Sequence, residues 1–361
     1  MDKRGMKLGA ENLAISKEGA KQMPEKPLPN YEVVPLRSDV TRVGVIQGRN
    51  KTADPSNPDL GKKENIEHMC WLIDHAQQYG VRPEMMKDLI VFHESPVQGW
   101  DGLFTREEQY ALAIDANGWE VEKLGEKAKE YNCYIIFGST YTRHEGWPGH
   151  YANTGFLINP EGKIILKAWK TDNLPGMGWS STIYDILDKF LEMYGWEAVF
   201  PVARTDIGNI AIFPATREPE IARAFAIKGT EILVRYMTNG RPFRFEVPAL
   251  CYANRFYGVF VNQAVYEGDR RPADTDGGGT AVFDDTGKMI AEATSLHETI
   301  VSVNIPIATF RKTHSIPVVR KALFECVWAE YECKYPPNSY LDHLPKSKMD
   351  ALEQLRKIAR W

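Results

Sequence analysis

Two charged side chains stand at the ends of predicted strands, where a fold can hold a reactive group firmly. Glu94 ends the apolar run DLIVFHE, and Lys170 ends KIILKAWK. A carboxylate partly removed from water at a strand end suits general-base work, and a nearby ammonium group can stabilise negative charge on a substrate. The alternatives are a capping or ion-pairing glutamate, and surface charges for both Lys167 and Lys170. His93 faces the other side of its strand by alternation and is predicted to be structural.

A third feature is the turn that follows the predicted strand GNIAIF at 208–213. Pro214 ends this strand because it has no N–H, and the next helix begins near Pro219. Backbone N–H groups at such a turn can stabilise an oxyanion, and a nucleophile at the strand end would use them. Phe213 occupies that place, and a phenyl ring cannot attack a substrate. We expect the substrate to contact the residues of this turn, Phe213, Pro214, Thr216 and Arg217.

Alternating strands and helices must position these residues. The pattern predicts strands at 41–50, 88–94, 133–141, 208–213, 231–236 and 257–265, and hairpins at 151–170 and 279–294. Helical spacing of apolar residues predicts helices at 61–80, 105–131, 219–228 and 246–256. Repeated strand–helix units interrupted by hairpins predict a layered α/β fold with mixed sheets and helices outside.

Composition narrows the class of protein. The chain has 361 residues, of which 43% are hydrophobic, enough for one large α/β domain. The net charge of −4, without a long block of one sign, argues against nucleic acid or an anionic membrane as the main partner. The charged N-terminus and the lack of an apolar window of about 18 residues predict a soluble, cytosolic protein. The five cysteines show no CxxC or Cys/His spacing, so neither disulfides nor a metal site is predicted.

Three regions are predicted along the chain. Residues 1–40 contain closely spaced prolines and are expected to form an extended arm on the body or on a partner subunit. Residues 41–309 contain the strand–helix pattern. Residues 310–361 break it and include YPPNSYLDHLP, which is too rich in proline for one helix. We expect this C-terminal extension to clasp a neighbouring subunit in a homo-oligomer, a dimer or larger.

Four segments, in order, resemble the nitrilase or carbon-nitrogen hydrolase superfamily, and most closely its aliphatic amidase and formamidase branch. DLIVFHESPVQGW is similar to the family's glutamate segment, GKIILKAWK to its lysine segment, and GNIAIFPATREPEIARAFAIKGTEILVRY to its cysteine segment. ALCYANRFYGVFVNQA is similar to the helix and strand that follow. The resemblance runs from about Thr41 to Thr309.

The resemblance implies a four-layer α-β-β-α sandwich whose subunits pair through an outer helical layer, and a small-molecule substrate with no metal or organic cofactor. It also implies amide or nitrile hydrolysis by a Glu-Lys-Cys triad. By this resemblance Glu94 is the general base and Lys170 stabilises the tetrahedral intermediate. The family's cysteine lies six residues before the proline that matches Pro219, so Phe213 stands at the position of the nucleophile.

Three functional hypotheses follow from this departure. In the first, the protein hydrolyses a carbon-nitrogen bond with water activated by Glu94, and Phe213 forms an apolar wall. In the second, it is a catalytically silent homologue with a binding or regulatory role, and Glu94 and Lys170 form a structural ion pair. In the third, Thr216 supplies a hydroxyl nucleophile from three residues along the turn. The resemblance also implies an additional acidic residue a few positions after the lysine in the amidase branch. The only acidic residue close after Lys170 is Asp172.

Overall fold

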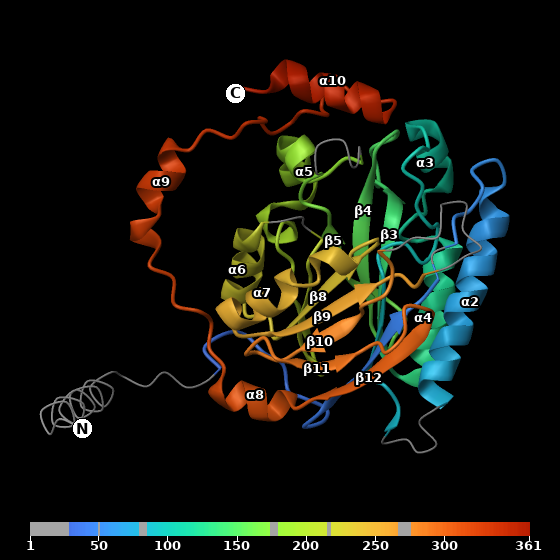
Figure 1. The fold of residues 1–361 in the computed structure, drawn as a ribbon, viewed down its shortest axis with the longest axis vertical. Helices are drawn as coiled ribbons and strands as arrows, with labels where there is room; N and C mark the ends of the chain where they lie inside the picture. The colour runs from blue at the N-terminus through green and yellow to red at the C-terminus, as the bar shows by residue number, and fades with distance from the viewer. Residues whose placement is uncertain (1–28, 50, 79–84, 174–179, 215–217, 266–275) are drawn as a thin grey trace, which may run out of the picture.

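Two β-sheets stacked face to face form the centre of the molecule (Figure 1). The computed structural model describes residues 29–49, 51–78, 85–173, 180–214, 218–265 and 276–361. Within these ranges each sheet contains six strands. The strand–helix alternation of the sequence therefore produces a layered structure.

The first sheet has the strand order β12-β1-β2-β3-β4-β5. Its strands are β1 (Thr41–Gln47), β2 (Leu89–Phe92), β3 (Tyr134–Arg143), β4 (Tyr151–Ile158), β5 (Ile164–Trp169) and β12 (Thr299–Ile305). Strands β1, β2 and β3 are parallel, whereas β4, β5 and β12 pair antiparallel with their neighbours. The parallel strands are almost entirely buried, as expected for strands covered on both faces.

The second sheet has the order β11-β10-β9-β8-β7-β6. Its strands are β6 (Ala203–Thr205), β7 (Gly208–Ile212), β8 (Ile232–Met237), β9 (Tyr257–Asn262), β10 (Ala281–Phe283) and β11 (Met289–Glu292). Here β7, β8 and β9 are parallel and the outer strands are antiparallel. Both sheets therefore consist of three parallel strands extended by antiparallel ones.

The core between the sheets is made by alternate side chains of the strands. Val43 and Val91 face inward from the first sheet, and Ile212 and Val234 face them from the second. All four are fully buried. Because side chains alternate along a strand, the residues between them point to the outer faces, where helices cover them.

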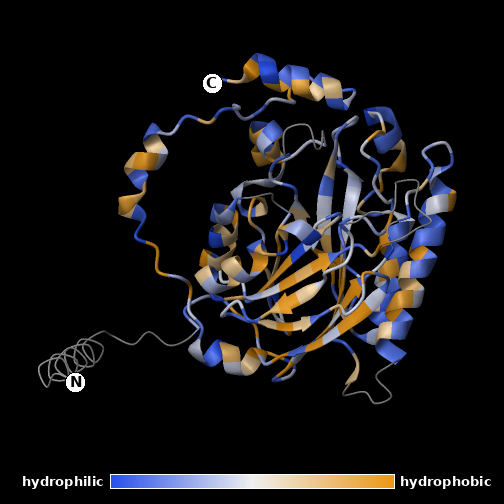
Figure 2. Cartoon of the chain, in the orientation of Figure 1, coloured by the Kyte–Doolittle hydropathy of each residue, from blue (hydrophilic) through white to orange (hydrophobic). Residues whose placement is uncertain are grey.

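Helices form the two outer layers. Helices α2 (Pro58–Gln78) and α4 (Trp119–Tyr131) pack on the first sheet, and α6 (Pro219–Ile227) and α7 (Glu246–Asn254) pack on the second. Figure 2 shows the strands mostly orange and the helices striped, as expected for one apolar face per helix. The order helix, sheet, sheet, helix confirms the predicted α-β-β-α sandwich.

The structure differs from the predicted elements in several places. The helix predicted over 105–131 is two helices, α3 (Arg106–Leu112), which begins at a Thr105 capping box, and α4. They are separate because Ala113 is extended and the backbone of Ile114 hydrogen-bonds to β3. The pattern does not predict β6, β12, α5 (Leu187–Tyr194) or α8 (Ile307–Thr313). Short 3-10 helices lie at Tyr184–Ile186, Trp196–Ala198, Arg241–Phe243 and Lys321–Leu323. No helix in the described ranges is both long and apolar enough to span a membrane.

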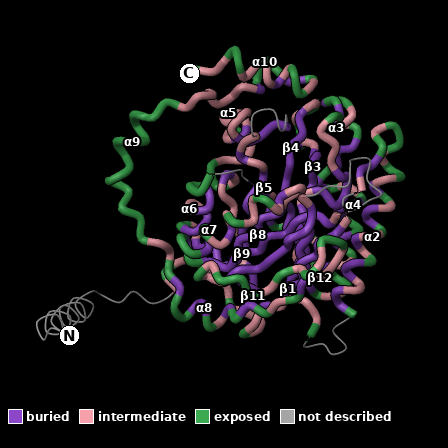
Figure 3. The backbone as a smooth tube through the Cα atoms, viewed as in Figure 1, coloured by how far each residue is buried: buried purple, intermediate pink, exposed green. Residues whose placement is uncertain are grey.

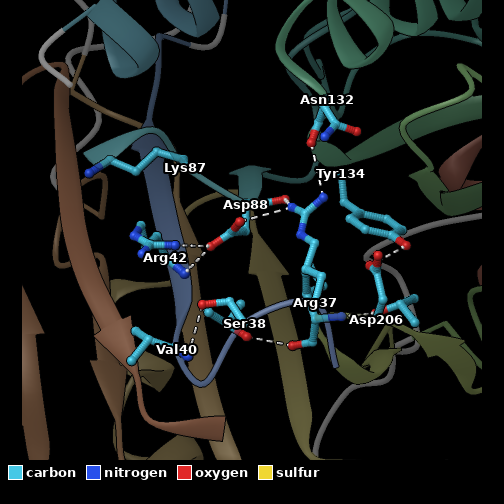
Figure 4. Close-up of polar contacts among 12 residues, drawn as sticks. Arg37, Ser38, Val40, Arg42, Lys87, Asp88, Asn132, Tyr134 and Asp206 are labelled. Atoms are coloured by element: carbon cyan, nitrogen blue, oxygen red, sulfur yellow. Dashed lines mark hydrogen bonds and ion pairs between the residues drawn. The ribbon is translucent and has the colours of Figure 1, made fainter. Parts of the chain in front are cut away.

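The described part of the N-terminal segment, residues 29–40, lies against the body of its own chain. The Arg37 amide donates to the Asp206 carbonyl oxygen at 2.8 Å, and its guanidinium donates to Asp88 Oδ1 at 2.9 Å (Figure 4). Asp88 Oδ2 also accepts from the Arg42 amide at 2.8 Å. Since Asp88 precedes β2 and Asp206 precedes β7, Arg37 connects the two sheets at the beginnings of two inner strands.

The C-terminal segment leaves the body after α8 and returns to it before α10 (Lys348–Ile358) (Figure 1). Between them every residue of 318–332, including α9 (Glu325–Glu330), is exposed; this stretch, which we call the exposed arm, is green in Figure 3. The chain docks again at Tyr340, which is 2% exposed and whose amide donates to the Asp185 carbonyl oxygen at 2.9 Å.

Candidate active site

Glu94 and Lys170 lie together in the folded chain. Glu94 follows β2 and Lys170 follows β5, two strands of the same sheet. Lys170 Nζ is 3.8 Å from Glu94 Oε1, and the two side chains are 20% and 17% exposed. Both side chains are therefore mostly, but not completely, withdrawn from water. Water screens such a pair less than a surface pair, so each group acts strongly on its neighbours.

The Glu94 carboxylate is held by one donor from each sheet. Asn153 Nδ2, from β4 of the first sheet, donates to Oε1 at 2.6 Å. The backbone amide of Thr238, directly after β8 of the second sheet, donates to Oε2 at 2.9 Å. The two donors fix the orientation of the carboxylate, each holding one of its oxygens.

Asn153 is itself held in place. The buried Tyr236 hydroxyl, from β8, donates to Asn153 Oδ1 at 3.3 Å. This contact fixes the amide so that Nδ2 points to Glu94. The Asn153 carbonyl oxygen accepts from the Lys170 amide at 2.8 Å. Asn153 therefore contacts both sequence-predicted residues, one through its side chain and the other through its backbone.

Only one of the two candidate lysines faces Glu94. Lys167 Nζ pairs instead with Glu145 Oε1 at 3.1 Å, and the Glu145 side chain is more than half exposed. Lys170 therefore lies beside a partly buried carboxylate, whereas Lys167 forms an ion pair with an exposed one. The sequence alone does not distinguish the two lysines.

A chain of hydroxyl groups lies beside the carboxylate. Ser95 Oγ is 2.6 Å from Thr140 Oγ1 and 2.9 Å from Thr238 Oγ1. Ser95 and Thr140 are buried, whereas Thr238 is partly exposed. The chain runs from the interior of the first sheet to the residue whose amide binds Glu94.

Phe213 directs its ring toward the helices of the second sheet. It is 1% exposed and packs in a cluster with Phe225 and Val247. The Arg235 guanidinium carbon lies 4.7 Å from the ring centroid, and Arg235 Nη1 donates to the Phe213 carbonyl oxygen at 3.3 Å. Arg235 also pairs with Glu246 at 3.5 Å. Burial lowers the pKa of Arg235, whereas the carboxylate of Glu246 acts in the opposite direction.

Of the other residues predicted in the turn, only Pro214 lies within the described residues. Pro214 is buried next to Phe213. Thr216 and Arg217 fall in 215–217, outside the described residues. His93 is fully buried; its Nε2 is 3.2 Å from the Arg49 carbonyl oxygen, and its Nδ1 accepts from the Ser95 amide at 3.3 Å. These contacts agree with the structural role predicted for it.

Sequence reasoning missed Asn153 and Thr238. Asn153 lies in the predicted hairpin YANTGFLINP, in a strand that is buried throughout. A polar residue in a buried strand needs a hydrogen-bond partner, and this need was the signal that could have pointed to it. Thr238 follows the apolar run EILVRYM, at the same kind of strand end that pointed to Glu94. Neither signal says which groups will meet, because the Asn153 contact depends on the strand order within the first sheet and the Thr238 contact on the stacking of the two sheets.

The arrangement combines a carboxyl group, a lysine amine and a set of fixed hydrogen-bond partners. A carboxylate of this kind can remove a proton from water, and an ammonium group can stabilise an oxygen that becomes negative during attack. Together these are the elements of a hydrolytic site.

The chain belongs to the carbon-nitrogen hydrolase family, whose model matches residues 42–315. Formamidases of Bacillus thuringiensis (strain Al Hakam) and Bacillus anthracis are 27% identical to it over 191 residues, which is 50% of this chain. The matched region spans about half the length of these relatives, 52%.

Solved structures of an amidase from Nesterenkonia share the fold. One of them covers 80% of this chain and 96% of its own, with a TM-score of 0.53 and 15% identity. A second, a mutant that shows covalent addition of the acetamide moiety of fluoroacetamide at its active-site cysteine, covers 83% and 98% with a TM-score of 0.54 and 14% identity. At this identity the likeness concerns the sandwich fold.

Proposed function

We propose that the protein hydrolyses a carbon-nitrogen bond of a small, non-peptide amide or nitrile, with Glu94 as the general base and Lys170 as the stabiliser of the developing oxyanion. The observation that supports this most is the pair itself, at 3.8 Å, with the Glu94 carboxylate oriented by Asn153 and Thr238. A pair with only a structural role would not require the carboxylate to be oriented from both sheets.

For an amide the reaction proceeds in two steps. Glu94 takes a proton from water, and the oxygen of that water attacks the carbonyl carbon, so that the carbonyl oxygen becomes negative beside Lys170. The tetrahedral intermediate then collapses: the carbon-nitrogen bond breaks, and the proton on Glu94 passes to the leaving nitrogen. The products are a carboxylic acid and an amine or ammonia, and Glu94 is ionised again.

A water-based route is proposed because of Phe213. In the register of the cysteine segment Phe213 stands where the family's nucleophile is expected, and its ring is buried against Arg235. With no thiol at this position, water is the simplest attacking group. We further propose that the turn of Phe213, Pro214, Thr216 and Arg217 lies near the substrate, with the Phe213 ring itself packed away from it among the helices of the second sheet.

The test compares matched variants on one substrate panel. Purified protein is incubated with formamide, acetamide, larger amides, nitriles and cyclic amides, beside Glu94→Gln, Lys170→Ala and Lys167→Ala. We expect Glu94→Gln and Lys170→Ala each to lower kcat by about 10²-fold or more, because base and oxyanion stabilisation are each worth that much. Lys167→Ala is the control, since Lys167 pairs with Glu145 outside the site. Ligand binding without turnover across the panel would instead establish a silent binding homologue.

We also propose that the protein acts as a cytosolic homo-oligomer and that the exposed arm contacts a second copy. The support for a partner is that the arm places Val318, Leu323, Val327 and Trp328 in water at exposures of 57% or more. Contiguous apolar surface of this kind marks a contact with another protein.

A further inference from the structure

We propose that the Thr238 hydroxyl binds the attacking water together with Glu94 Oε2. This inference rests on the proposed hydrolysis and adds to it a residue that holds the nucleophile. It follows from the position of Thr238 relative to the carboxylate, from the different partners of the two carboxylate oxygens, and from the hydroxyl chain behind Thr238.

Thr238 lies directly against the base. Its backbone nitrogen is 2.9 Å from Glu94 Oε2, and only Cα and Cβ separate that nitrogen from Oγ1. The hydroxyl and the carboxylate oxygen are therefore close enough for one water molecule to bridge them. Thr238 is partly exposed, so this water can exchange with solvent and meet a substrate.

The two oxygens of Glu94 have different surroundings. Oε1 accepts the short bond from Asn153 and faces the Lys170 ammonium group. Oε2 accepts the Thr238 amide, and a carboxylate oxygen has a second lone pair. Oε1 thus already faces both Asn153 and Lys170, whereas Oε2 lies on the side of Thr238 with a lone pair that a water can use. Proton transfer from water is therefore expected at Oε2, on the side of Thr238.

The hydroxyl chain fixes the orientation of Thr238. Ser95 Oγ contacts Thr238 Oγ1 at 2.9 Å and is itself in contact with Thr140 Oγ1 at 2.6 Å. The branched side chain of threonine has few χ1 rotamers, and a buried partner selects one of them. A hydroxyl can donate one hydrogen bond and accept two, so a Thr238 hydroxyl bonded to Ser95 can still bind a water.

The experiment compares Thr238→Val, Thr238→Ser and Thr140→Val on a substrate that the wild type turns over. Valine keeps the shape of threonine and removes the hydroxyl, serine keeps the hydroxyl, and Thr140→Val alters the buried end of the chain without touching the water. We expect Thr238→Val to lower kcat by about 10²-fold with KM within about threefold, and to change the solvent deuterium isotope effect on kcat. Thr238→Ser should retain activity within about tenfold. Thr140→Val, which removes a partner of Ser95 but leaves the Thr238 hydroxyl in place, should lower kcat by less than Thr238→Val does. Thermal melting checks that each variant is folded.

The outcomes separate this inference from the proposed function. If Glu94→Gln is inactive while Thr238→Val is as active as the wild type, the hydrolysis stands and the role of Thr238 is wrong. If intact-protein mass spectrometry of the reacting enzyme finds an acyl group on Thr238, the residue is a nucleophile and the water-binding role is wrong. If the wild type turns over nothing on the panel, the proposed function fails and this inference fails with it.

Discussion

At the scale of single residues, Phe213 is the position at which we propose that this chain departs from the family pattern. A phenylalanine in a well-packed cluster contributes to stability as well as to the shape of the turn. Its ring is 1% exposed, and the Arg235 guanidinium lies over it. The residue is therefore both part of the core of the second sheet and the neighbour of a buried charge.

We predict that Phe213→Ala lowers the free energy of unfolding by about 3–5 kcal/mol, because it removes a buried ring and leaves a cavity. Phe213→Leu should cost less, since it fills part of that space. The control is Phe245→Ala, whose ring is 70% exposed and whose loss should change stability by less than about 0.5 kcal/mol. Urea unfolding measures all three. Equal effects at the two positions would show that the ring at Phe213 is not packed as described.

The residues of the site could be predicted from the sequence only in part. Glu94 and Lys170 stand at the ends of strands that the apolar pattern marks, so residue type and position together pointed to them. Asn153 and Thr238 were not predicted because their contacts with Glu94 depend on tertiary structure, namely the strand order of the first sheet for Asn153 and the stacking of the two sheets for Thr238.

At the scale of elements, the hairpin of β3 and β4 contains two buried histidines. His144 follows β3 and stacks on Trp169 with ring centroids 4.8 Å apart, and His150 precedes β4. Burial lowers the pKa of His144 to about 4 and that of His150 to about 3, and the charge of Arg106 acts in the same direction on both. Both imidazoles are therefore neutral in the folded protein at neutral pH.

These two histidines should make the fold sensitive to acid. The unfolded chain binds protons at its histidines below about pH 6.5, whereas the folded chain does not bind them until about pH 4 or 3. The free energy of unfolding should therefore fall as the pH drops from 6.5 toward 4, by up to about 2 kcal/mol per histidine at pH 5.

Urea unfolding at pH 7 and pH 5 measures this effect. In a variant with both His144→Gln and His150→Gln, the difference in stability between the two pH values should shrink, whereas in His297→Gln, which changes an exposed histidine, it should not. A pH difference that is the same in the double variant and the wild type would show that other groups cause the acid sensitivity.

Most of the elements could be predicted from apolar periodicity, because the strands and outer helices have clear patterns. The exceptions are informative. The break between α3 and α4 accompanies the hydrogen bonds of the Ile114 backbone to β3, a tertiary contact that the continuous helical spacing does not reveal. Strand β6 has only three residues, and β12 belongs to the first sheet although it follows every strand of the second in the sequence. The local sequence pattern cannot show that the chain returns to the first sheet after completing the second.

At the scale of the whole molecule, the exposed arm is notable because its apolar side chains have no contact with the described residues of the same chain's body that would bury them. It leaves the body after α8, extends into solvent at α9, and then docks again at Tyr340 beside Asp185 (Figure 1). The docked end is held by further contacts, among them the Ser339 hydroxyl to Asp185 Oδ1 at 2.7 Å. The segment around Tyr340 is held against the body, whereas the exposed arm before it is not. This arrangement is expected if a second copy of the chain covers the exposed arm.

We predict that a variant with Leu323→Asp and Trp328→Asp shifts the protein from an oligomer to a smaller species, because charges in an apolar contact lose their water without gaining partners. Light scattering after size-exclusion chromatography measures the molar mass. Leu103→Asp is the control, since Leu103 is 90% exposed and lies far from the arm in the sequence. A wild type that is already monomeric, or a variant that stays oligomeric, would contradict the proposed role of the arm.

The donors that hold Glu94 have a consequence for which substitutions the chain can tolerate. Since one donor comes from each sheet, the position of the carboxylate depends on how the two sheets are aligned over their whole contact. Residues such as Val91 and Val234 pack between the sheets. We expect substitutions at these positions to be limited both by the stability of the core and by the position of the Glu94 carboxylate. A change there that leaves the fold stable can still move one donor away from the base, so the core of this sandwich is expected to evolve more slowly than stability alone requires.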